Sequence, residues 1–288
     1  MNSRTSVERR PLSPVLRWAG GKRWLIPRIE QILDAYSPDE YVEPFVGGAS
    51  VFLAFDWPRA VISDVNKDLI ATYRGLAANA ELVRQRLSRL PVSKKTYIEV
   101  RDRTCVADTD RAVRLLYLNR CAYAGIYRTN RAGEFNVPFS GDRDLKPLVQ
   151  TDSLLRVGAA LGRAAMSADD FEQTLSSVQS GAVVYCDPAY ALPGSESHFR
   201  RYSPAAFDWS DQCRLADAVH ELRSRGVCVL VSNSADPRVT KLFRGGLTFR
   251  FQRRAAFPRS NGKVLEEALY VLADRNTLRR VRRRLGDG

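Results

Sequence analysis

Short apolar runs that end in turn residues alternate with longer amphipathic stretches along the chain. The runs predict β-strands at 41–45, 60–63, 182–186 and 227–232, with a further pair at 247–251 and 268–272. Helical spacing follows the glycine turn at Gly20-Gly21 and returns at 51–57 and at 207–225, where Gly226 supplies a C-terminal stop. Residues 67–170 have a polar, mostly helical pattern, and we expect no clear strand before 182.

The order of these elements predicts an open α/β sheet with an inserted domain. We expect a core at 15–70 and 172–275 and an insert at 71–171, with a disordered lead-in at 1–14 and a basic tail at 276–288. Ligands of such sheets lie at the carboxyl ends of the strands. Gly47-Gly48, Asp64 and Asp187 follow three predicted strands, so we expect them to converge.

The charge composition of the chain indicates what kind of partner it binds. The chain has 45 Lys plus Arg against 32 Asp plus Glu, a formal net charge of +13, which favours a polyanionic partner such as nucleic acid. The alternative is a basic surface that only maintains solubility. Hydrophobic residues make up 44% of the chain, enough for a sizeable core.

Cysteine and histidine usage limits the chemistry. The five cysteines form no CxxC pair, which disfavours a disulfide framework or a zinc site and fits the reducing cytoplasm. With only two histidines, a His base or a His-ligated metal is disfavoured, and we expect no metal. No apolar run approaches the ~20 residues of a membrane helix, and the N-terminus lacks a signal-peptide core.

A glycine turn and an acid follow the first two predicted strands. Gly47-Gly48 would let the backbone pass close to a ligand, although an ordinary tight turn explains the pair equally well. Asp64 is placed to accept hydrogen bonds from ribose hydroxyls, or else to cap a helix. Together they suggest a cofactor that contains a nucleoside. The GxGxxG fingerprint of nicotinamide enzymes is absent.

The segment Trp18-Ala19-Gly20-Gly21-Lys22 is only superficially like a phosphate-binding loop. Leu16 occupies the position where GxxxxGK requires glycine, and Arg23 follows Lys22 in place of Ser or Thr. A nucleoside triphosphatase is therefore disfavoured. The plainer interpretation is an N-terminal packing segment with Trp18 in the core.

Asp187-Pro188-Ala189-Tyr190 ends the third strand with groups that suit an amino-bearing base. Two acceptors, the Asp187 carboxylate and the Pro188 carbonyl, would localise the lone pair of the amine on its nitrogen. Proline would preorganise the backbone, and Tyr190 would stack on an extruded base. The alternative is a plain exit from a strand into a turn.

Residues 116–141 interleave aromatic side chains with arginines and asparagines, a pattern that suits contact with DNA bases and phosphates. The alternative is a helix and loop with core tyrosines and solvated arginines. The residues concerned are Tyr117, Asn119, Arg120, Tyr123, Tyr127, Arg128, Asn130, Arg131, Phe135, Asn136 and Phe139.

The chain resembles the Dam-type DNA adenine-N6 methyltransferases over most of residues 15–273. The matching segments stand in that family's order: LRWAGGKRWLIPRI, VEPFVGGASVF, ISDVNKDLI, LYLNRCAYAGIYRTNRAGEFNVPFSG, VVYCDPAY, VLVSNS and RRAAFPRSNGKVLEEALYVL. The resemblance implies a Rossmann-like methyltransferase sheet with an inserted, mainly helical target-recognition domain. It also implies S-adenosylmethionine as cofactor, double-stranded DNA as partner, and methyl transfer to the N6 amine of a flipped adenine.

The resemblance assigns roles by position. It implies Asp187, Pro188 and Tyr190 as catalytic residues. It implies a cofactor site formed by Trp18, Lys22, Phe45, Gly47, Asp64 and Asp187. The DNA-contacting positions are Tyr123, Ile126, Arg128 and Pro138, to which the polar pattern adds Asn130.

Three positions depart from the family pattern. Ala189 stands where the family usually has a second proline, and Ala124 where relatives often carry asparagine. Ser234 replaces a frequent histidine. Both amine acceptors at Asp187 and Pro188 are kept, so we expect activity.

Two alternatives remain open. One is the same fold acting on the exocyclic amine of cytosine or on RNA, and the other is a catalytically inactive DNA-binding protein. The target sequence, the oligomeric state and any link to a restriction-modification system or a phage also stay open. So does the tail from Arg279 to Arg284, which would either hold DNA phosphates or end as a solvated helix.

Overall fold

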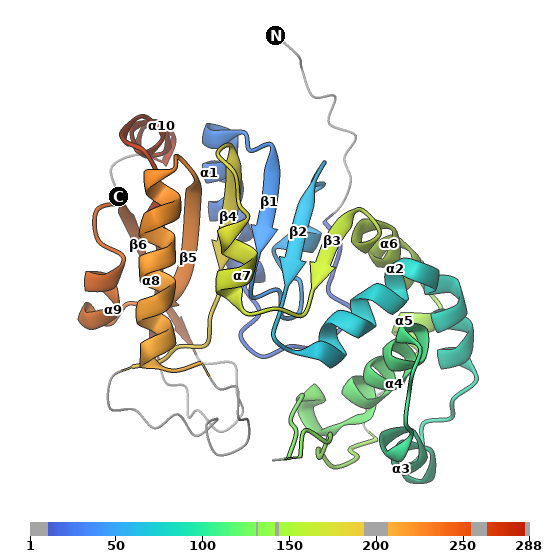
Figure 1. The fold of residues 1–288 in the computed structure, drawn as a ribbon. Helices are drawn as coiled ribbons and strands as arrows, with labels where there is room; N and C mark the ends of the chain where they lie inside the picture. The colour runs from blue at the N-terminus through green and yellow to red at the C-terminus, as the bar shows by residue number, and fades with distance from the viewer. Residues whose placement is uncertain (1–10, 131, 142–143, 193–206, 255–263, 286–288) are drawn as a thin grey trace.

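A seven-stranded sheet forms the centre of the computed structural model, which describes residues 11–130, 132–141, 144–192, 207–254 and 264–285. The strand order is β3-β2-β1-β4-β5-β7-β6 (Figure 1). The strands are β1 Glu40–Glu43, β2 Ala60–Ser63, β3 Ala164–Ser167, β4 Ala182–Cys186, β5 Cys228–Ser234, β6 Leu247–Arg254 and β7 Val264–Leu272. Strands β1 to β5 are parallel, whereas β7 is antiparallel to both β5 and β6. The expected α/β fold class is confirmed.

The central strands are buried on both faces, which explains their continuous apolar runs. Side chains alternate between the faces along each strand. In β4, Val183 and Tyr185 join one apolar cluster, and Val184 and Cys186 join the other. The first cluster includes residues of α1 (Ile26–Tyr36) and α10 (Arg275–Leu285). The second includes residues of α7 (Phe171–Ser176), α8 (Trp209–Ser224) and α9 (Pro237–Leu242).

A group of helices lies between β2 and β3 in sequence and beside the β3 edge of the sheet in space (Figure 1). They are α2 Lys67–Ser88, α3 Lys94–Asp102, α4 Asp108–Cys121, α5 Lys146–Val149 and α6 Ser153–Leu161, with a 3-10 turn η3 at Tyr123–Gly125. Their buried side chains belong to the same apolar cluster as one face of the sheet. The boundary proposed at 70/71 falls inside α2, and the division into core and insert stays a prediction.

Two sequence predictions about single elements were wrong. Residues 51–57 form only a 3-10 turn, η2 Phe52–Ala54, because Phe55 is extended and Pro58 follows Trp57. A short strand, β3, was missed within 67–170. Its Ala-Ala-Met-Ser sequence lies partly exposed at the edge of the sheet and carries little of the apolar signal of the central strands.

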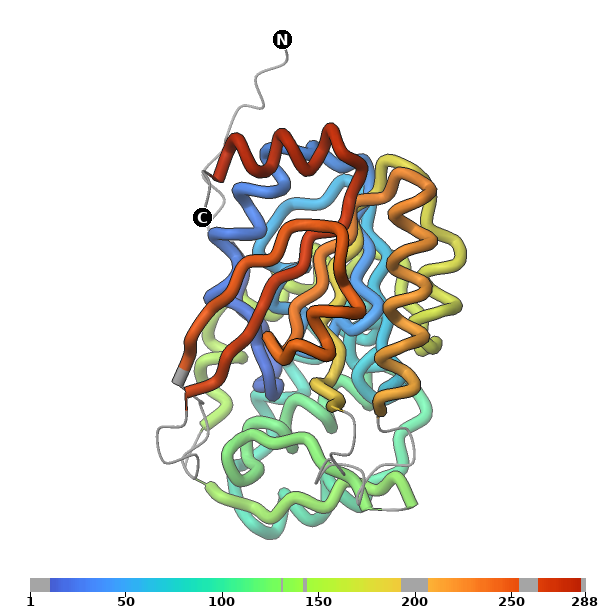
Figure 2. Tube along the Cα trace, turned by 90° about the vertical axis from the view of Figure 1, so that its left-hand side faces the viewer, coloured from blue at the N-terminus to red at the C-terminus, as the bar shows by residue number. Residues whose placement is uncertain are grey.

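The predicted lead-in at 1–14 and basic tail at 276–288 fall partly on residues outside the described part, and both stay predictions. Residues 1–10 and 286–288 lie outside the described part, but the Leu12 N–H donates to the Leu53 carbonyl over 3.0 Å. The arginine-rich segment forms α10, which packs on α1 through buried Val281. It lies at the end of the molecule opposite α3 and α4 (Figure 2). Arg284 pairs with Asp34 of α1 over 2.6 Å. This placement favours the solvated helix end over a DNA grip.

The described residues contain no helix that combines the length and the apolar character needed to cross a membrane.

The closest approach of α2 to the start of α4 depends on Gly75. A Cβ atom added there would lie 2.2 Å from the Asp108 carbonyl oxygen. We expect Gly75→Ala to lower the free energy of unfolding by about 1–3 kcal/mol, because the backbones must separate. Gly162→Ala is the control, since its Cβ would meet no atom closer than 3.4 Å. Urea titration of both variants measures the difference, and equal stabilities would contradict the close-packing argument.

Candidate active site

Asp64 and the glycine turn meet at the carboxyl ends of β1 and β2, as expected. The Gly47 N–H donates to Asp64 Oδ2 over 3.1 Å, and the Asn66 N–H donates to Oδ1 over 2.9 Å. The helix cap of α2 is Asn66, whose side chain accepts from the Leu69 N–H, so Asp64 is not the capping residue. Burial raises the pKa of Asp64, and the two N–H groups oppose that rise. Each carboxylate oxygen keeps acceptor capacity for a hydroxyl.

Trp18 lies directly on the glycine turn. A Cβ atom at Gly47 would lie 2.9 Å from Trp18 Cδ1, and one at Gly48 would lie 2.9 Å from Trp18 Cβ. Gly47 also has a φ of +44°, a conformation that favours glycine. The Tyr73 hydroxyl fixes the turn by donating to the Gly47 carbonyl over 2.5 Å. Trp18 is half-buried rather than a core residue.

Phe45 stands on the other side of β1, within an aromatic group. Its ring stacks on Phe171 at 5.4 Å between centroids and meets Phe207 edge-on at 5.7 Å. The side chain therefore borders the same strand ends as Gly47 from the α7 side of the sheet.

Lys22 is brought to Asp187 across 165 positions of sequence. Its ammonium lies 2.9 Å from Asp187 Oδ1 and 3.1 Å from Oδ2, and it also donates to the Gly20 carbonyl over 2.7 Å. Ser232, at the end of β5, donates to Asp187 Oδ1 over 2.7 Å. Burial raises the pKa of Asp187, and the Lys22 charge and the Ser232 hydroxyl oppose that rise. The side chain of Lys22 is only 5% exposed, so this ion pair is shielded from water.

The hydroxyl of Tyr190 is hydrogen-bonded to a buried acid, Glu267, which was not predicted as a site residue. Its hydroxyl donates to Glu267 Oε2 over 2.8 Å, and Arg253 lies 3.1 Å from Glu267 Oε1. Pro188 is buried, whereas Ala189 is exposed. Ser232, Arg253 and Glu267 were thus missed. The acid pair Glu266-Glu267, which interrupts the apolar residues of β7, is the one sequence signal that could have marked Glu267.

The predicted DNA-contacting residues lie in one hairpin-like loop after α4. Isolated antiparallel bridges join Ala122 to Phe139 and Thr129 to Phe135. Tyr123 is 53% exposed, and its N–H donates to the Pro138 carbonyl over 2.9 Å.

Two polar side chains of this loop are already engaged in shaping it. Asn130 accepts from the Ala132 and Glu134 N–H groups and donates to the Glu134 carboxylate. The Arg128 guanidinium donates to Asn136. Ile126 is half-buried beside them.

Ala124 adopts a left-handed backbone conformation with a φ of +54°. Asparagine and glycine adopt that conformation more readily than alanine does. An asparagine would therefore suit this exposed position, in line with the family pattern that the resemblance implies.

Hydrogen bonds and ring stacking connect the loop to the segment that contains Arg17 and Trp18. Asn119, buried at the end of α4, accepts from the Arg17 N–H and donates to the carbonyls of Arg17 and Gly125. The Trp18 ring stacks on Tyr127 at 5.3 Å between centroids. The structure therefore brings the predicted recognition loop next to Trp18.

The strand ends hold a buried acid bonded to a glycine turn, and an Asp-Pro-x-Tyr segment beside a buried lysine. The sheet, parallel from β1 to β5 with an antiparallel pair at one edge, is consistent with a Rossmann-like methyltransferase fold. Residues 18–256 match the family described as D12 class N6 adenine-specific DNA methyltransferase. The chain belongs to that family.

Individual relatives are similar over most of their length. A type II methyltransferase of Lactococcus lactis subsp. cremoris is 32% identical over 271 residues, covering 88% of this chain and 94% of the relative. A DNA adenine methylase of Vibrio cholerae is 34% identical over 237 residues, covering 80% and 84%. The retron Ec67 DNA adenine methylase of Escherichia coli is 32% identical over 240 residues, covering 81% of each chain.

The chain is therefore an adenine-specific DNA methyltransferase that uses S-adenosylmethionine, and DNA is its substrate. The residues at the strand ends fit that cofactor, because Asp64 keeps acceptor capacity for hydroxyls beside a turn without side chains. Among the described residues, no three His, Cys, Asp or Glu side chains are grouped so that they could hold a metal ion.

Removing the Lys22 ammonium tests the buried ion pair. We expect Lys22→Ala to lower the free energy of unfolding by about 3 kcal/mol near neutral pH, because Asp187 loses its partner while buried. The pKa of Asp187 should rise further. A group whose pKa is raised in the folded state favours folding at low pH, so the loss should shrink toward about pH 5.

Urea titration at several pH values measures this effect, with the exposed Lys241→Ala as the matched control. A loss of equal size at all pH values would contradict the coupling between Lys22 and Asp187.

Proposed function

We propose that Asp187 and the Pro188 carbonyl accept hydrogen bonds from the N6 amine of an adenine turned out of the DNA stack, while Tyr190 stacks on its ring. The main observation in support is the fixed position of Asp187 between Lys22 and Ser232 at the end of β4. Oδ1 receives both partners, whereas Oδ2 receives only Lys22 and keeps capacity for an amine N–H. Two acceptors on one amine localise its lone pair, and preorganisation makes them effective.

We further propose that the cofactor lies along Trp18, Lys22, Phe45, Gly47, Asp64 and Asp187. Asp64 would accept from the ribose hydroxyls, and the Trp18 ring lies against the Gly47 turn to which Asp64 is bonded. S-adenosylmethionine supplies the methyl group as an electrophile when it is bound. Orientation by these residues is the main contribution that the chain makes to the transfer.

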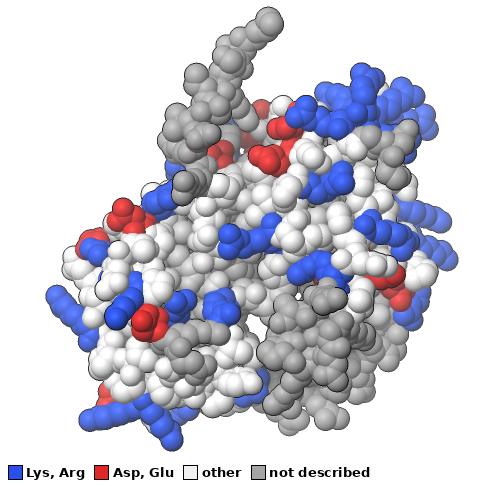
Figure 3. Space-filling model, turned by 180° about the vertical axis from the view of Figure 1, so that it is seen from behind, with Lys and Arg blue, Asp and Glu red and all other residues white. Residues whose placement is uncertain are grey.

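Double-stranded DNA is the proposed form of the substrate. Lys and Arg visibly outnumber Asp and Glu on the face shown in Figure 3, in line with the net charge of +13. Tyr123, Ile126, Arg128, Asn130 and Pro138 are the proposed contacts to DNA. Because the Asn130 side chain already shapes its own turn, its expected contribution is to hold the loop rather than to read a base.

The proposed site of action is the cytoplasm, where the free thiols of this chain would stay reduced. The inactive alternative is not favoured, because Ala189 is exposed and its replacement of a proline removes no buried contact. The target sequence, and any pairing with a restriction nuclease, are to be established by mapping methylated sites.

Transfer of labelled methyl from S-adenosylmethionine to DNA lacking adenine methylation tests these roles. We expect label as N6-methyladenine, and Asp187→Ala should lower the rate by about 100-fold or more, because one amine acceptor is lost. Asp217→Ala, an exposed acid on α8, is the control and should keep the wild-type rate.

Three results would count against the proposal. Full activity of Asp187→Ala would remove its central residue. Label on cytosine or RNA would support the alternative substrate, and DNA binding without any label would support the inactive protein.

A further inference from the structure

Glu267 is a buried acid, 5% exposed, that faces the strand ends from β7. Antiparallel pairing places it opposite Ser234 at the end of β5. Its two oxygens have separate partners: Oε2 accepts from the Tyr190 hydroxyl over 2.8 Å, and Oε1 lies 3.1 Å from the Arg253 guanidinium. Lys22 is 3.9 Å from Oε2 while it contacts Asp187 more closely. Glu267 therefore connects Tyr190 of the proposed adenine site to Arg253 and, at a longer distance, to Lys22.

Arg253 is itself fixed, which makes Glu267 a rigid acceptor. The guanidinium lies over the Trp24 ring, 4.6 Å from its centroid, and Trp24 meets Phe251 edge-on. The Lys22 ammonium lies 5.2 Å from the centroid of the Tyr190 ring. Tyr190 is thus held at its hydroxyl by Glu267 and contacted by Lys22.

Stacking on a base needs only an aromatic ring, and a phenylalanine offers the same face. The hydrogen bond from the Tyr190 hydroxyl to a buried carboxylate has a different effect. It fixes the tilt and position of the ring before a base binds. We propose that Glu267 is a positioning residue that holds Tyr190 in the stacking orientation through this hydrogen bond. The inference rests on the proposed role of Tyr190.

The negative charge of Glu267 has a second effect, on the pKa of Asp187, which can be separated from its hydrogen bond to Tyr190. The groups that face it are Lys22, Asp187, Tyr190 and Arg253, from four different segments. Its negative charge is one of the influences that raise the pKa of Asp187, after burial. Removing that charge while keeping an acceptor should therefore shift the acid limb of the pH–rate profile to lower pH.

Four variants separate these effects in the methyl-transfer assay. Tyr190→Phe keeps the ring and loses the donor, and Glu267→Leu loses the acceptor. Each should lower kcat about tenfold, the size expected for one hydrogen bond to a charged group. The double variant should be no worse than either single one, because both remove the same bond. Glu267→Gln should recover most of the activity and move the acid limb to lower pH.

The neighbouring Glu266→Leu is the matched control, because Glu266 is exposed on the same strand. Binding of S-adenosylmethionine should change less than twofold in all variants, and thermal unfolding shows which of them remain folded. Additive losses in the double variant, or a Tyr190→Phe variant with wild-type kcat, would overturn the inference. An inactive wild-type protein would instead refute the proposed function, so the two failures are distinguishable.

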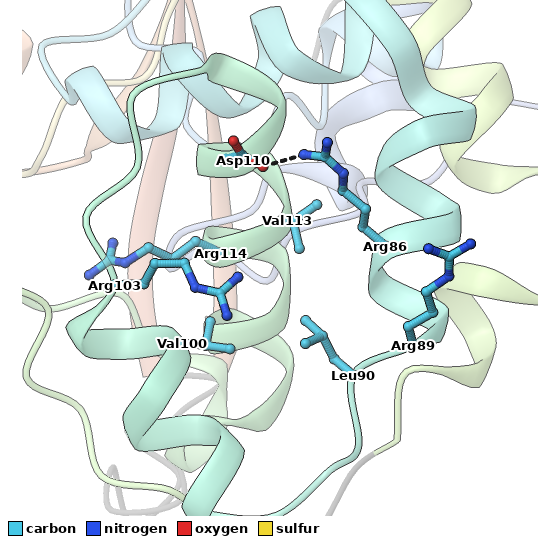
Figure 4. Close-up of a pocket in the computed structure, with 8 residues that line it drawn as sticks. All are labelled: Arg86, Arg89, Leu90, Val100, Arg103, Asp110, Val113 and Arg114. Carbon is cyan, nitrogen blue, oxygen red and sulfur yellow. Dashed lines mark hydrogen bonds and ion pairs between the residues drawn. The ribbon is translucent and has the colours of Figure 1, made fainter.

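A second, independent feature is a hollow of about 300 Å³ among α2, α3 and α4 (Figure 4). Its lining combines the apolar side chains of Leu90, Val100 and Val113 with the charged residues Arg86, Arg89, Arg103, Asp110 and Arg114. The lining therefore holds four arginines and one acid, and among these described residues only Arg86 is paired with that acid (Figure 4). None of the predicted catalytic, cofactor or DNA-contacting residues lines this hollow.

Two of the arginines are already engaged. Arg86 pairs with Asp110, and Arg114 donates to the Arg101 carbonyl over 2.6 Å. The guanidinium groups of Arg89 and Arg103 make no hydrogen bond or ion pair with any residue in the described part of the chain. Guanidinium groups bind phosphate oxygens through paired N–H bonds, and apolar side chains suit the sugar attached to a phosphate. We infer that this hollow binds a sugar phosphate, from the DNA backbone or from a free nucleotide.

The variant Arg89→Ala/Arg103→Ala tests this site, with Arg279→Ala/Arg283→Ala on α10 as a control of equal charge change. If the phosphate belongs to DNA, the first pair should weaken DNA binding and reduce the slope of log affinity against log salt by about 2, and the control much less. If the ligand is free, DNA binding should match the control, while binding of adenosine monophosphate, measured by calorimetry, should be lost. Unchanged DNA binding, together with no nucleotide binding by the wild-type protein, would overturn the inference.

Discussion

The buried ion pair between Lys22 and Asp187 is the contact on which the active site depends. It joins the segment before α1 to the end of β4, and the same ammonium approaches Glu267 of β7. An unpaired charge at this depth would be costly, so the ion pair holds three segments in one arrangement. Ser232 and Arg253 complete the network by contacting the two acids. The reactive edge of the sheet is therefore rigid before any ligand arrives.

Close backbone contact is the second constraint, and it sets where the Trp18 segment meets the loop after α4. Trp18 rests on Gly47 and Gly48 at distances that exclude any Cβ atom, and its ring continues onto Tyr127. Asn119 binds the backbone on both sides of this junction, at Arg17 and Gly125. These contacts connect the sheet to the loop that carries Tyr123, so the proposed base and cofactor sites share supporting residues.

Elements with strong local signals were predictable from the sequence. The runs at 60–63 and 182–186 became β2 and β4 with the same bounds, because strands buried on both faces must be apolar throughout. Edge strand β3 was not predicted, because its partly exposed residues carry little apolar signal. The 3-10 turn at Phe52–Ala54 was predicted as a longer helix, because the local pattern does not show that the chain becomes extended before Pro58. The convergence of Gly47 with Asp64 was predictable, since parallel strands end at one edge.

The family, the α/β class and the residues that carry the motifs could be inferred from the amino-acid sequence alone, because they depend on the order and spacing of short segments. Which side chains support those residues depends on how distant segments meet in the folded chain. Glu267 meets Tyr190 at a sequence separation of 77 and Lys22 meets Asp187 at a separation of 165, so no local pattern could pair them. Burial then made those pairs matter, because charges and hydroxyls shielded from water must find partners.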